Sequence, residues 1–399
     1  MEGINEQPNL NLNLNFKMRK SIEVDVEPEV LRWLRESAGW KLEDVGSRIK
    51  ASAVNVKAYE EGRKKPTLRQ VAEMSRAFRR PLAAFFLPEP KKEEPLPEDY
   101  RMLPGKKDVF DKKTILAIRK ARDLQNISME LSKNIEYETK PRIKKVKLMD
   151  SPEKTAGEFR EEFKLTEEKQ IKFKDAYKLF NYLRDILEDM NIMVFQIPMP
   201  VEDARGFALA DASPSVIVVN TKDSIEARLF SLVHEFAHII LGETVIDLPE
   251  LSAKARNNVE KWCNKFASSF LLPEETAAKM FKDSENPTST KTLNAVSRKY
   301  KVSKALLLFR MYKSDYITQE KYYETLDRYK PGDMPLKEKK ERKQGGIPSD
   351  KKRISEVGTK FVSLVANNFD KNLITYGDAL NYLSIKSKNF DRVLSKAAK

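Results

Sequence analysis

The sequence contains few of the features that stabilise secreted proteins or cross membranes. It has one cysteine in 399 residues, which excludes an intramolecular disulfide and is typical of a reducing compartment. It has no run of about eighteen apolar residues, the length needed to span a bilayer, and no apolar signal core near its N-terminus. We therefore expect a cytoplasmic protein without a membrane partner.

Acidic residues are fewer than basic ones. The chain has 60 Asp and Glu against 74 Lys and Arg, a formal net charge of +14. This excess favours a polyanionic partner such as nucleic acid, although surface lysines also serve solubility alone. Hydrophobic residues make up 40% of the chain, which is enough for packed cores, and the length allows two or three domains.

Histidine is scarce, and both histidines of the chain lie within residues 231–242. His234 and His238 are four residues apart on an expected apolar helix, the spacing at which two imidazoles on one face share a tetrahedral zinc. Glu235 is placed to take a proton from a water on that metal. The alternative, two core histidines bonded to backbone carbonyls, leaves a costly buried carboxylate unexplained.

A zinc site needs a third protein ligand, and we expect it from a second helix in residues 259–273. Helical spacing there gives one packed face. Glu260 is the best candidate for the ligand. Asn264 follows one turn later and is expected to hydrogen-bond a ligating imidazole. The packed face consists of Val259, Trp262, Phe266, Ser269 and Phe270.

Three other residues compete with Glu260 for the third ligand position. Cys263 is three residues further along the same helix, although a lone helical cysteine is more often a small buried hydrophobic residue. Glu243 and Glu250 are weaker rivals because they lie in the connection between the two helices.

The two helical motifs together resemble the ImmA/IrrE family of metallo-endopeptidases. They read His234-Glu-Phe-Ala-His238 and Glu260-x-x-Cys-Asn-x-Phe-Ala-x-x-x-Leu-Leu-Pro273, and Gly206-Phe-Ala-Leu also matches the family as a strand. The resemblance spans roughly residues 150–310. It implies a zincin-like α+β domain, gluzincin-like in its ligands, with Zn²⁺ on His234, His238 and Glu260 and with Glu235 as general base.

Residues 26–80 have the pattern of short amphipathic helices. We expect helices over 29–37, 42–49 and 53–61 and a fourth carrying Leu68 to Phe78, with Ser52 as the N-cap of the third. Two helices joined by a tight turn form the helix-turn-helix plan. Residues 52–67 resemble the recognition helix and following loop of the XRE family.

That resemblance implies a double-stranded DNA partner. Ala51, Val56 and Tyr59 face the core, and Lys50 stands where the family usually has a glycine, so the turn there has a conformational cost. A helical bundle for protein contacts is the alternative. Residues expected to enter the major groove are Ser52, Val54, Asn55 and Lys57, and those expected at phosphates are Arg63, Lys64 and Lys65.

The expected fold class is mostly α with an α+β protease domain and a small sheet. A helix-turn-helix pattern in residues 291–309 is either a second DNA reader or a structural brace, and its apolar run favours the brace. The C-terminal segment is a lid, a docking surface or an oligomer contact. The expected order is a disordered arm (1–24), a five-helix XRE-type domain (25–88), a linker (89–110), the zinc domain (111–285), a helical brace (286–330), a basic linker (331–353) and a C-terminal helical segment (354–399).

One of the strands before the metal motif is expected to hold the substrate. In zinc proteases of this build an edge strand binds an extended substrate through main-chain hydrogen bonds, although a core strand would have the same sequence pattern. The candidate strand comprises Ser215, Val216, Ile217, Val218, Val219 and Asn220.

These features predict a zinc endopeptidase fused to a sequence-specific DNA-binding domain. The family resemblance implies that its substrate is a transcriptional repressor or an antitoxin-like protein. The alternative is a non-proteolytic DNA-binding regulator with structural or sensory zinc, against which the general base Glu235 argues.

Overall fold

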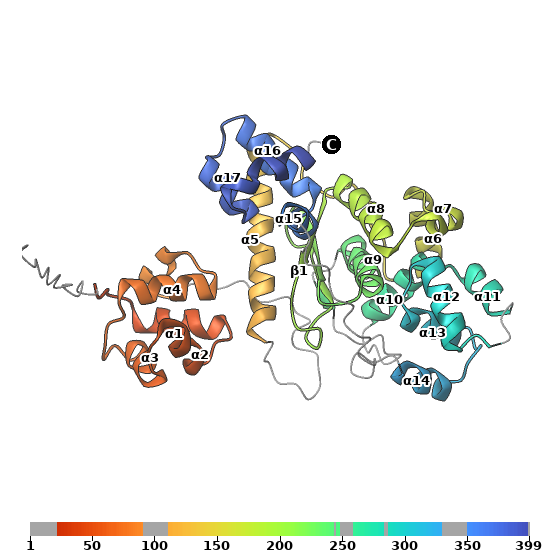
Figure 1. Cartoon of the computed structure of the whole chain (residues 1–399), viewed down its shortest axis with the longest axis horizontal. Helices are drawn as coiled ribbons and strands as arrows, with labels where there is room; N and C mark the ends of the chain where they lie inside the picture. Colours follow the sequence, from red (N-terminus) through yellow and green to blue (C-terminus); the bar gives the residue numbers. More distant parts are fainter. Residues whose placement is uncertain are drawn as a thin grey trace, which may run out of the picture. The chain divides into compact units, whose positions relative to one another are not determined.

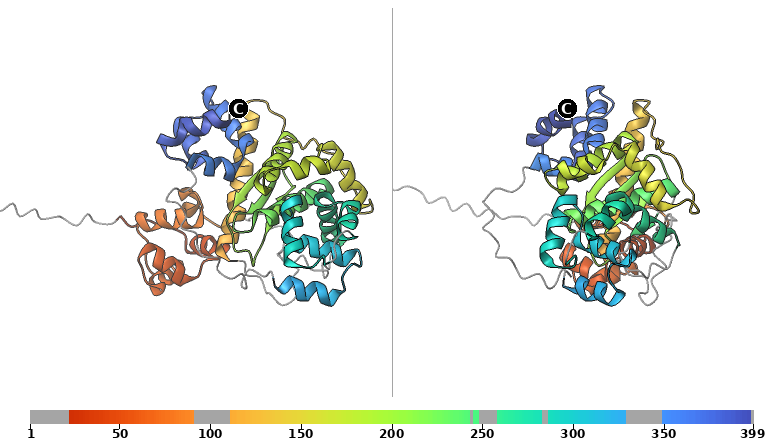
Figure 2. Two further views of the ribbon diagram at one scale, coloured as in Figure 1. Left: turned by 45° about the vertical axis from the view of Figure 1, so that its right-hand side comes forward. Right: turned by 90° about the vertical axis from the view of Figure 1, so that its right-hand side faces the viewer.

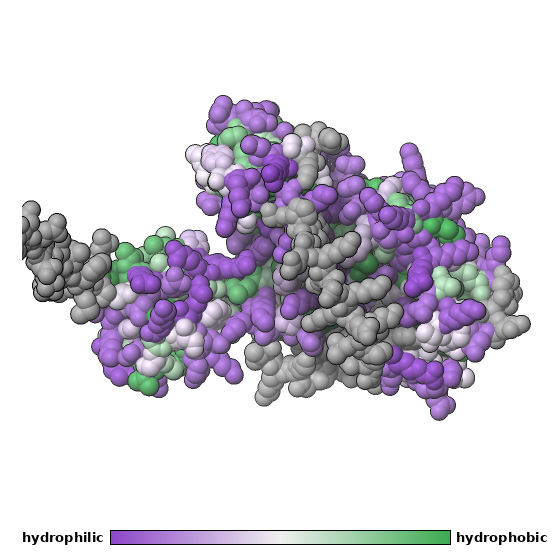
Figure 3. All heavy atoms as spheres, viewed as in Figure 1, coloured by the Kyte–Doolittle hydropathy of each residue, from purple (hydrophilic) through white to green (hydrophobic). Residues whose placement is uncertain are grey.

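The computed structural model describes residues 22–90, 111–242, 245–247, 258–282, 286–328 and 349–397. The chain divides into two compact units, Met1–Lys92 and Glu93–Lys399 (Figure 1). Both are mainly helical, and the second contains one small sheet, which confirms the predicted fold class. No described helix is long and apolar enough to cross a bilayer. Most of the surface in view is hydrophilic, with scattered apolar patches (Figure 3). The arm expected before residue 22 and most of both predicted linkers lie outside the described residues.

The first unit is a small helical domain around one core. The fifth element is a 3-10 helix rather than an α-helix, and the other helices lie within two residues of their predicted bounds. The buried residues come from every element and include Leu34, Val45, Val56, Met74 and Phe85. The elements are α1 (Pro28–Ser37), α2 (Leu42–Ile49), α3 (Ala53–Glu60), α4 (Leu68–Phe78) and η1 (Leu82–Phe86).

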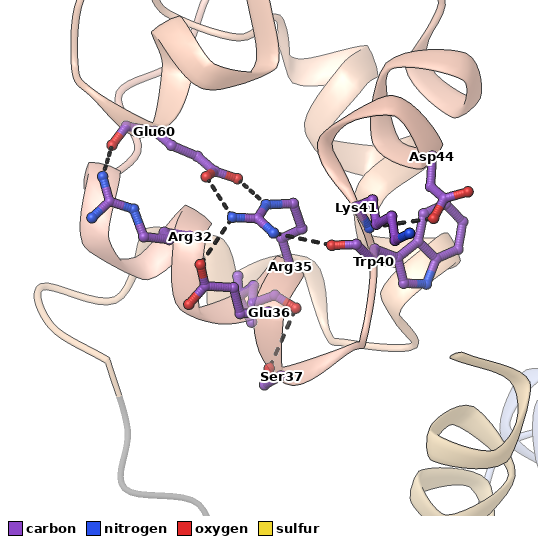
Figure 4. A network of polar contacts seen from close by, with 9 residues as sticks. Arg32, Arg35, Glu36, Ser37, Trp40, Lys41, Asp44 and Glu60 are labelled. Carbon is purple, nitrogen blue, oxygen red and sulfur yellow. Dashed lines mark hydrogen bonds and ion pairs between the residues drawn. The ribbon is translucent and has the colours of Figure 1, made fainter. Parts of the chain in front are cut away.

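An internal ion pair ties α1 to α3. The Arg35 guanidinium donates to Glu60 through Nε (2.6 Å) and Nη2 (2.9 Å), and its Nη1 donates to the Trp40 carbonyl at 3.0 Å (Figure 4). Glu60 is 4% exposed, so this bidentate pair is shielded from water. This pair holds the C-terminal end of α3 against the core, and the opposite side of α3 is exposed.

The turn between α2 and α3 is left-handed although a lysine occupies it, where the replacement of glycine had suggested a different turn. Lys50 adopts the left-handed conformation with φ 57°, the strained turn position expected from its replacing glycine. Gly46 is required beneath it, since a Cβ there would lie 2.6 Å from the Ala51 carbonyl oxygen. The Ser52 hydroxyl accepts from the Asn55 backbone N–H at 3.2 Å and caps α3 as predicted.

The second unit contains a four-stranded mixed sheet in the order β1-β3-β2-β4. β1 runs parallel to β3, and β2 is antiparallel to both β3 and β4. Every residue of β1, β2 and β3 is buried. The strands are β1 (Ile192–Ile197), β2 (Gly206–Leu209), β3 (Ser215–Asn220) and β4 (Val245–Asp247).

The position of β3 corrects the prediction that residues 215–220 form an edge strand for substrate. β3 pairs with β1 on one side and with β2 on the other, so it has no free edge. Because helices cover both faces of the sheet, the interior of β3 is apolar at every position. A central strand and an edge strand would therefore have the same sequence pattern. The Asn220 side chain instead binds the backbone of Met199, Ala204 and Lys222 within the chain.

The two faces of the sheet carry separate cores. Val194, Ala208 and Ile217 belong to the core beneath α8, α9 and α10, whereas Phe195 and Val218 point into a core shared with α5 and the C-terminal helices (Figures 1 and 2). The helices around the first core are α6 (Pro152–Glu162), α7 (Glu167–Lys172), α8 (Ala176–Asp189), α9 (Ile225–Leu241), α10 (Asn258–Leu271), α11 (Glu274–Lys282), α12 (Thr290–Tyr300), α13 (Lys304–Lys313) and α14 (Gln319–Asp327). Those of the second are α5 (Lys112–Asn134), α15 (Ser349–Val357), α16 (Thr359–Asp370), α17 (Tyr376–Leu383), η3 (Ser387–Asn389) and α18 (Phe390–Ala397).

The C-terminal helices form part of this second core. α15 begins at Ser349, five residues before the predicted start of the segment, and packs along β1. A buried ion pair on α8 holds it there: Arg184 Nε lies 2.8 Å from Glu188 Oε1, and Arg184 Nη1 donates to the Ser355 carbonyl at 2.7 Å. Glu188 Oε2 accepts from the Lys360 backbone N–H at 2.9 Å, at the N-terminus of α16. We call these contacts the C-terminal latch.

The helix-turn-helix pattern of α12 and α13 lies against the first core. Leu306, Leu307, Leu308 and Met311 of α13 are buried, so the helix that would read DNA has its apolar side inside the protein. This burial supports the structural brace over a second DNA reader.

Candidate metal centre

Hydrogen bonds fix both ends of helix α9, and its polar residues lie between those ends. Ser224 caps its start, where the hydroxyl accepts from the Ala227 backbone N–H at 3.2 Å. At its end Gly242 is left-handed with φ 85°, and Lys145 Nζ donates to the Ile239 carbonyl at 2.7 Å. His234, Glu235 and His238 lie between these caps and are fully buried.

The two histidines and Glu260 of α10 converge on one point. The Nε2 atoms of His234 and His238 are 3.0 Å apart. Glu260 Oε2 lies 3.2 Å from the first Nε2, and Glu260 Oε1 lies 3.2 Å from the second. Two ligand atoms of a tetrahedral zinc at 2.0–2.1 Å would be about 3.3 Å apart. The three donors therefore have nearly the spacing that such an ion requires.

The protonation states also suit a metal. Burial alone would raise the pKa of Glu260, but hydrogen bonds from His234 and His238 outweigh it and hold the pKa well below its usual range. Burial lowers the pKa of His238, against the opposing influence of Glu260. At neutral pH the carboxylate is ionised and this imidazole is neutral, the forms in which both residues bind metals.

Of the rivals for the third ligand, Cys263 lies on the wrong side of the ring. Its Sγ is 3.6 Å from His238 Nδ1, the nitrogen that faces away from the convergence point. Among the described residues, His234, His238 and Glu260 are the one group placed to hold a metal ion. Glu243 and Glu250 lie outside the described residues.

The surface of α3 carries the residues predicted to contact DNA. Val54 is 72% exposed, and the side chains of Lys57 and Arg63 are more than 60% exposed. Lys64 Nζ donates to Asn55 Oδ1 at 2.9 Å. Val56 and Tyr59 on the opposite side are buried, as predicted.

Two family models match separate segments of the chain. Residues 187–312 match the model of the IrrE N-terminal-like domain, and residues 29–84 match that of a helix-turn-helix domain. The chain joins an XRE-like helix-turn-helix domain to an ImmA/IrrE-like peptidase domain. This confirms the resemblance seen in the sequence. A search among curated proteins found no match to the chain.

The ImmA/IrrE-like match includes the whole metal centre, since it covers β1, β2, β3, α9 and α10. A peptidase domain of this family implies a metal ion and a protein substrate. The helix-turn-helix match includes α3 and the loop after it, which supports DNA binding.

The ImmA/IrrE-like domain also contains contacts that the sequence did not predict. A Cβ on Gly206 of β2 would lie 2.9 Å from Glu235 Oε1 and 2.9 Å from the Val218 carbonyl oxygen. The Glu235 carboxylate therefore packs directly on the backbone of β2. The glycine in the family-like motif Gly206-Phe-Ala-Leu was the available signal for this contact.

Asn264 is half-buried, and its predicted hydrogen bond to a ligating imidazole stays a prediction. The neighbouring Cys263 contacts His238, with Sγ 3.6 Å from Nδ1. One residue along a helix turns the side chain by about 100°, so these two residues do not face the site in the same way. Sequence spacing alone left both residues within reach of the site.

Proposed function

We propose that the chain is a zinc-dependent endopeptidase joined to a sequence-specific DNA-binding domain. Its substrate would be a transcriptional repressor or an antitoxin-like protein, as the family resemblance implies. The observation that carries the proposal is the convergence of two imidazole nitrogens and one carboxylate at 3.0–3.2 Å, with Glu235 beside them on α9. Two nitrogen donors and one carboxylate are a typical catalytic zinc set with one open position.

Each residue of the centre has a role in peptide hydrolysis. His234, His238 and Glu260 hold the ion, which when bound acidifies water and polarises the substrate carbonyl. Glu235 accepts the proton of the attacking water and delivers it to the leaving amine nitrogen. Gly206 keeps β2 close enough to support the Glu235 carboxylate in that position.

The strand order points to an edge for the substrate. The outer edge of β1 is covered, because Arg184 Nη2 donates to the Val194 carbonyl and α15 packs along this strand. β4 lies at the other end of the sheet, and α9 contacts it. Within the described residues β4 is therefore the better candidate to bind an extended substrate by strand addition.

The DNA-binding unit would bring the peptidase to a promoter or repress the operon of the chain itself. In this proposal Val54, Asn55 and Lys57 of α3 contact the bases of the major groove. Arg63 and Lys64 contact the phosphates. The Lys57→Ala, Arg63→Ala double variant should weaken binding, and the loss of Arg63 should reduce the salt dependence by about one phosphate contact. An unchanged salt dependence would favour a protein-contact bundle.

The Glu235→Gln variant tests the peptidase. It keeps the size of the side chain and the metal ligands, so folding and metal content should be unchanged while cleavage falls at least about 100-fold. The measurement is the cleavage of a protein encoded beside this chain after co-expression, with fragment masses to locate the cut. Glu226→Gln, in the first turn of the same helix, is the matched control and should cleave normally.

A second variant tests the metal ligands. Glu260→Ala should lower the zinc affinity by more than the 10–100-fold that loss of a ligand's hydrogen-bond partner causes. If Glu235→Gln leaves the biological effect intact while Glu260→Ala abolishes it, the chain is the alternative, a non-proteolytic regulator with structural or sensory metal. Equal zinc content in Glu260→Ala and wild type would refute the ligand assignment.

A further inference from the structure

Val54 has an unusual position for an apolar residue. At 72% exposure it is the most exposed large hydrophobic side chain among the described residues of the first unit. It lies in the first turn of α3, between the cap Ser52 and Asn55. A β-branched residue is not favoured in a helix, and this one gains nothing from burial. Neither helix formation nor the core of the unit therefore explains a valine at this position.

The neighbouring Asn55 has only part of its amide available. Lys64 Nζ lies 2.9 Å from its Oδ1, and an ammonium group has donors but no acceptor, so the contacting atom must be the oxygen. The Ser52 hydroxyl already accepts from the Asn55 backbone N–H. The bond to Lys64 uses one of the two lone pairs of Oδ1 and leaves both Nδ2 donors, so the Asn55 side chain presents chiefly a donor and is less suited to the paired contact that binds adenine.

A methyl-sized apolar surface beside a hydrogen-bond donor matches one base edge in the major groove. Thymine carries a 5-methyl group next to the O4 acceptor, whereas cytosine has no methyl group and presents an N4 donor. The first turn of a recognition helix is the part that reaches base edges. We propose that Val54 and Asn55 together read a thymine, Val54 through its methyl group and Asn55 through O4. This inference rests on the proposed DNA binding.

Four pyrimidine bases can distinguish the contact of Val54 with the methyl group from the contact of Asn55 with O4. Thymine has both features, uracil keeps O4 without the methyl group, 5-methylcytosine keeps the methyl group without O4, and cytosine has neither. Thymine and uracil pair with the same adenine, and the two cytosines pair with the same guanine. An exchange within either of these pairs therefore changes only the methyl group, whereas an exchange of thymine for 5-methylcytosine keeps the methyl group and replaces the O4 acceptor by an N4 donor.

The experiment uses the full chain and an operator obtained by selection from random duplexes, with Kd measured at one fixed salt concentration. Replacing the thymines of the operator by uracil one at a time should weaken binding at a single position by about four-fold, the effect of burying one methyl-sized group. Val54→Ala should bind thymine and uracil operators equally. Leu82→Ala, an exposed apolar residue of η1, is the control and should keep the four-fold difference.

The contact of Asn55 with O4 is tested by Kd measurements on the same operators. Asn55→Ala should bind the thymine and 5-methylcytosine operators with similar Kd, while its thymine-to-uracil difference remains. Lys64→Ala frees Oδ1 and should increase tolerance of adenine at this position.

Three results overturn the inference. The first is an operator with no position at which uracil weakens wild-type binding. The second is the same uracil effect in Val54→Ala as in wild type. The third is a chain that selects no sequence at all, which would overturn the proposed DNA binding as well, whereas the first two leave that proposal standing.

Discussion

The C-terminal latch should contribute strongly to the stability of the second unit. Arg184 and Glu188 are 4% and 3% exposed, and together they bind the backbone of α15 and the first turn of α16. Glu188→Gln keeps the shape of the side chain but leaves the Arg184 charge buried without its counter-ion. Breaking one partner of a buried pair typically costs about 3–5 kcal/mol. We expect a loss of that size.

Backbone hydrogen exchange of the full chain is the most direct assay, because it reports the latch locally. A loss of about 3–5 kcal/mol corresponds to about 10²- to 10³·⁵-fold less protection in α15, α16 and the neighbouring β1. The matched control is Glu158→Gln on α6, whose exposed carboxylate pairs with the exposed Lys144 at 3.1 Å. A surface pair of this kind contributes at most about 1 kcal/mol.

The double variant Arg184→Met, Glu188→Leu removes both charges together. It should be clearly more stable than Glu188→Gln, since no unpaired charge remains inside. The reasoning is refuted if Glu188→Gln changes protection no more than Glu158→Gln does. It is also refuted if the double variant is as unstable as the single one.

Three further predictions concern the metal centre and the first core. Gly206→Val should push the Glu235 carboxylate away from β2, so cleavage should fall while zinc content stays normal; normal cleavage would contradict the contact. Burial raises the pKa of Tyr322 to about 12. The protonated phenol therefore stabilises the folded state fully below the pKa of the unfolded chain, about 10, and this stabilisation is lost as the pH rises from about 10 to 12. Unfolding measured between pH 10 and 12 should show a loss of up to about 3 kcal/mol, and Tyr322→Phe should reduce this pH dependence. Lys145→Met removes a bond to the last turn of α9 and should lower the free energy of unfolding by about 1 kcal/mol, which thermal denaturation would detect.

The metal centre was predictable because its signal is local. The four-residue spacing of His234 and His238 puts both rings on one side of any helix, whatever surrounds it. Glu260 was predictable only through a second motif, since no spacing rule joins residues on separate helices. Asn264 and Cys263 could not be distinguished, because their difference is a rotation about α10 that depends on how α10 packs against α9.

The order of the strands in the sheet could not be predicted from the sequence pattern. Residues 215–220 were evident as a strand, but β3 proved to be central and not an edge. Strands covered on both faces are apolar at every position, so their sequence contains no trace of their neighbours. The role of the C-terminal segment was open for a similar reason, since its apolar helix faces fit any of several apolar surfaces.

The sequence by itself therefore determined the local features of this chain: the histidine pair with its glutamate, the capped helix at residues 53–60, and the absence of long apolar runs. These features depend on spacing along a helix and on composition, which are set by neighbouring residues. Only the tertiary structure decided the strand order, the support of Glu235 by Gly206, the orientation of Asn55 by Lys64 and the burial of the C-terminal latch. Each of these is a contact between residues that are apart in sequence, and such contacts arise from packing and not from local preference.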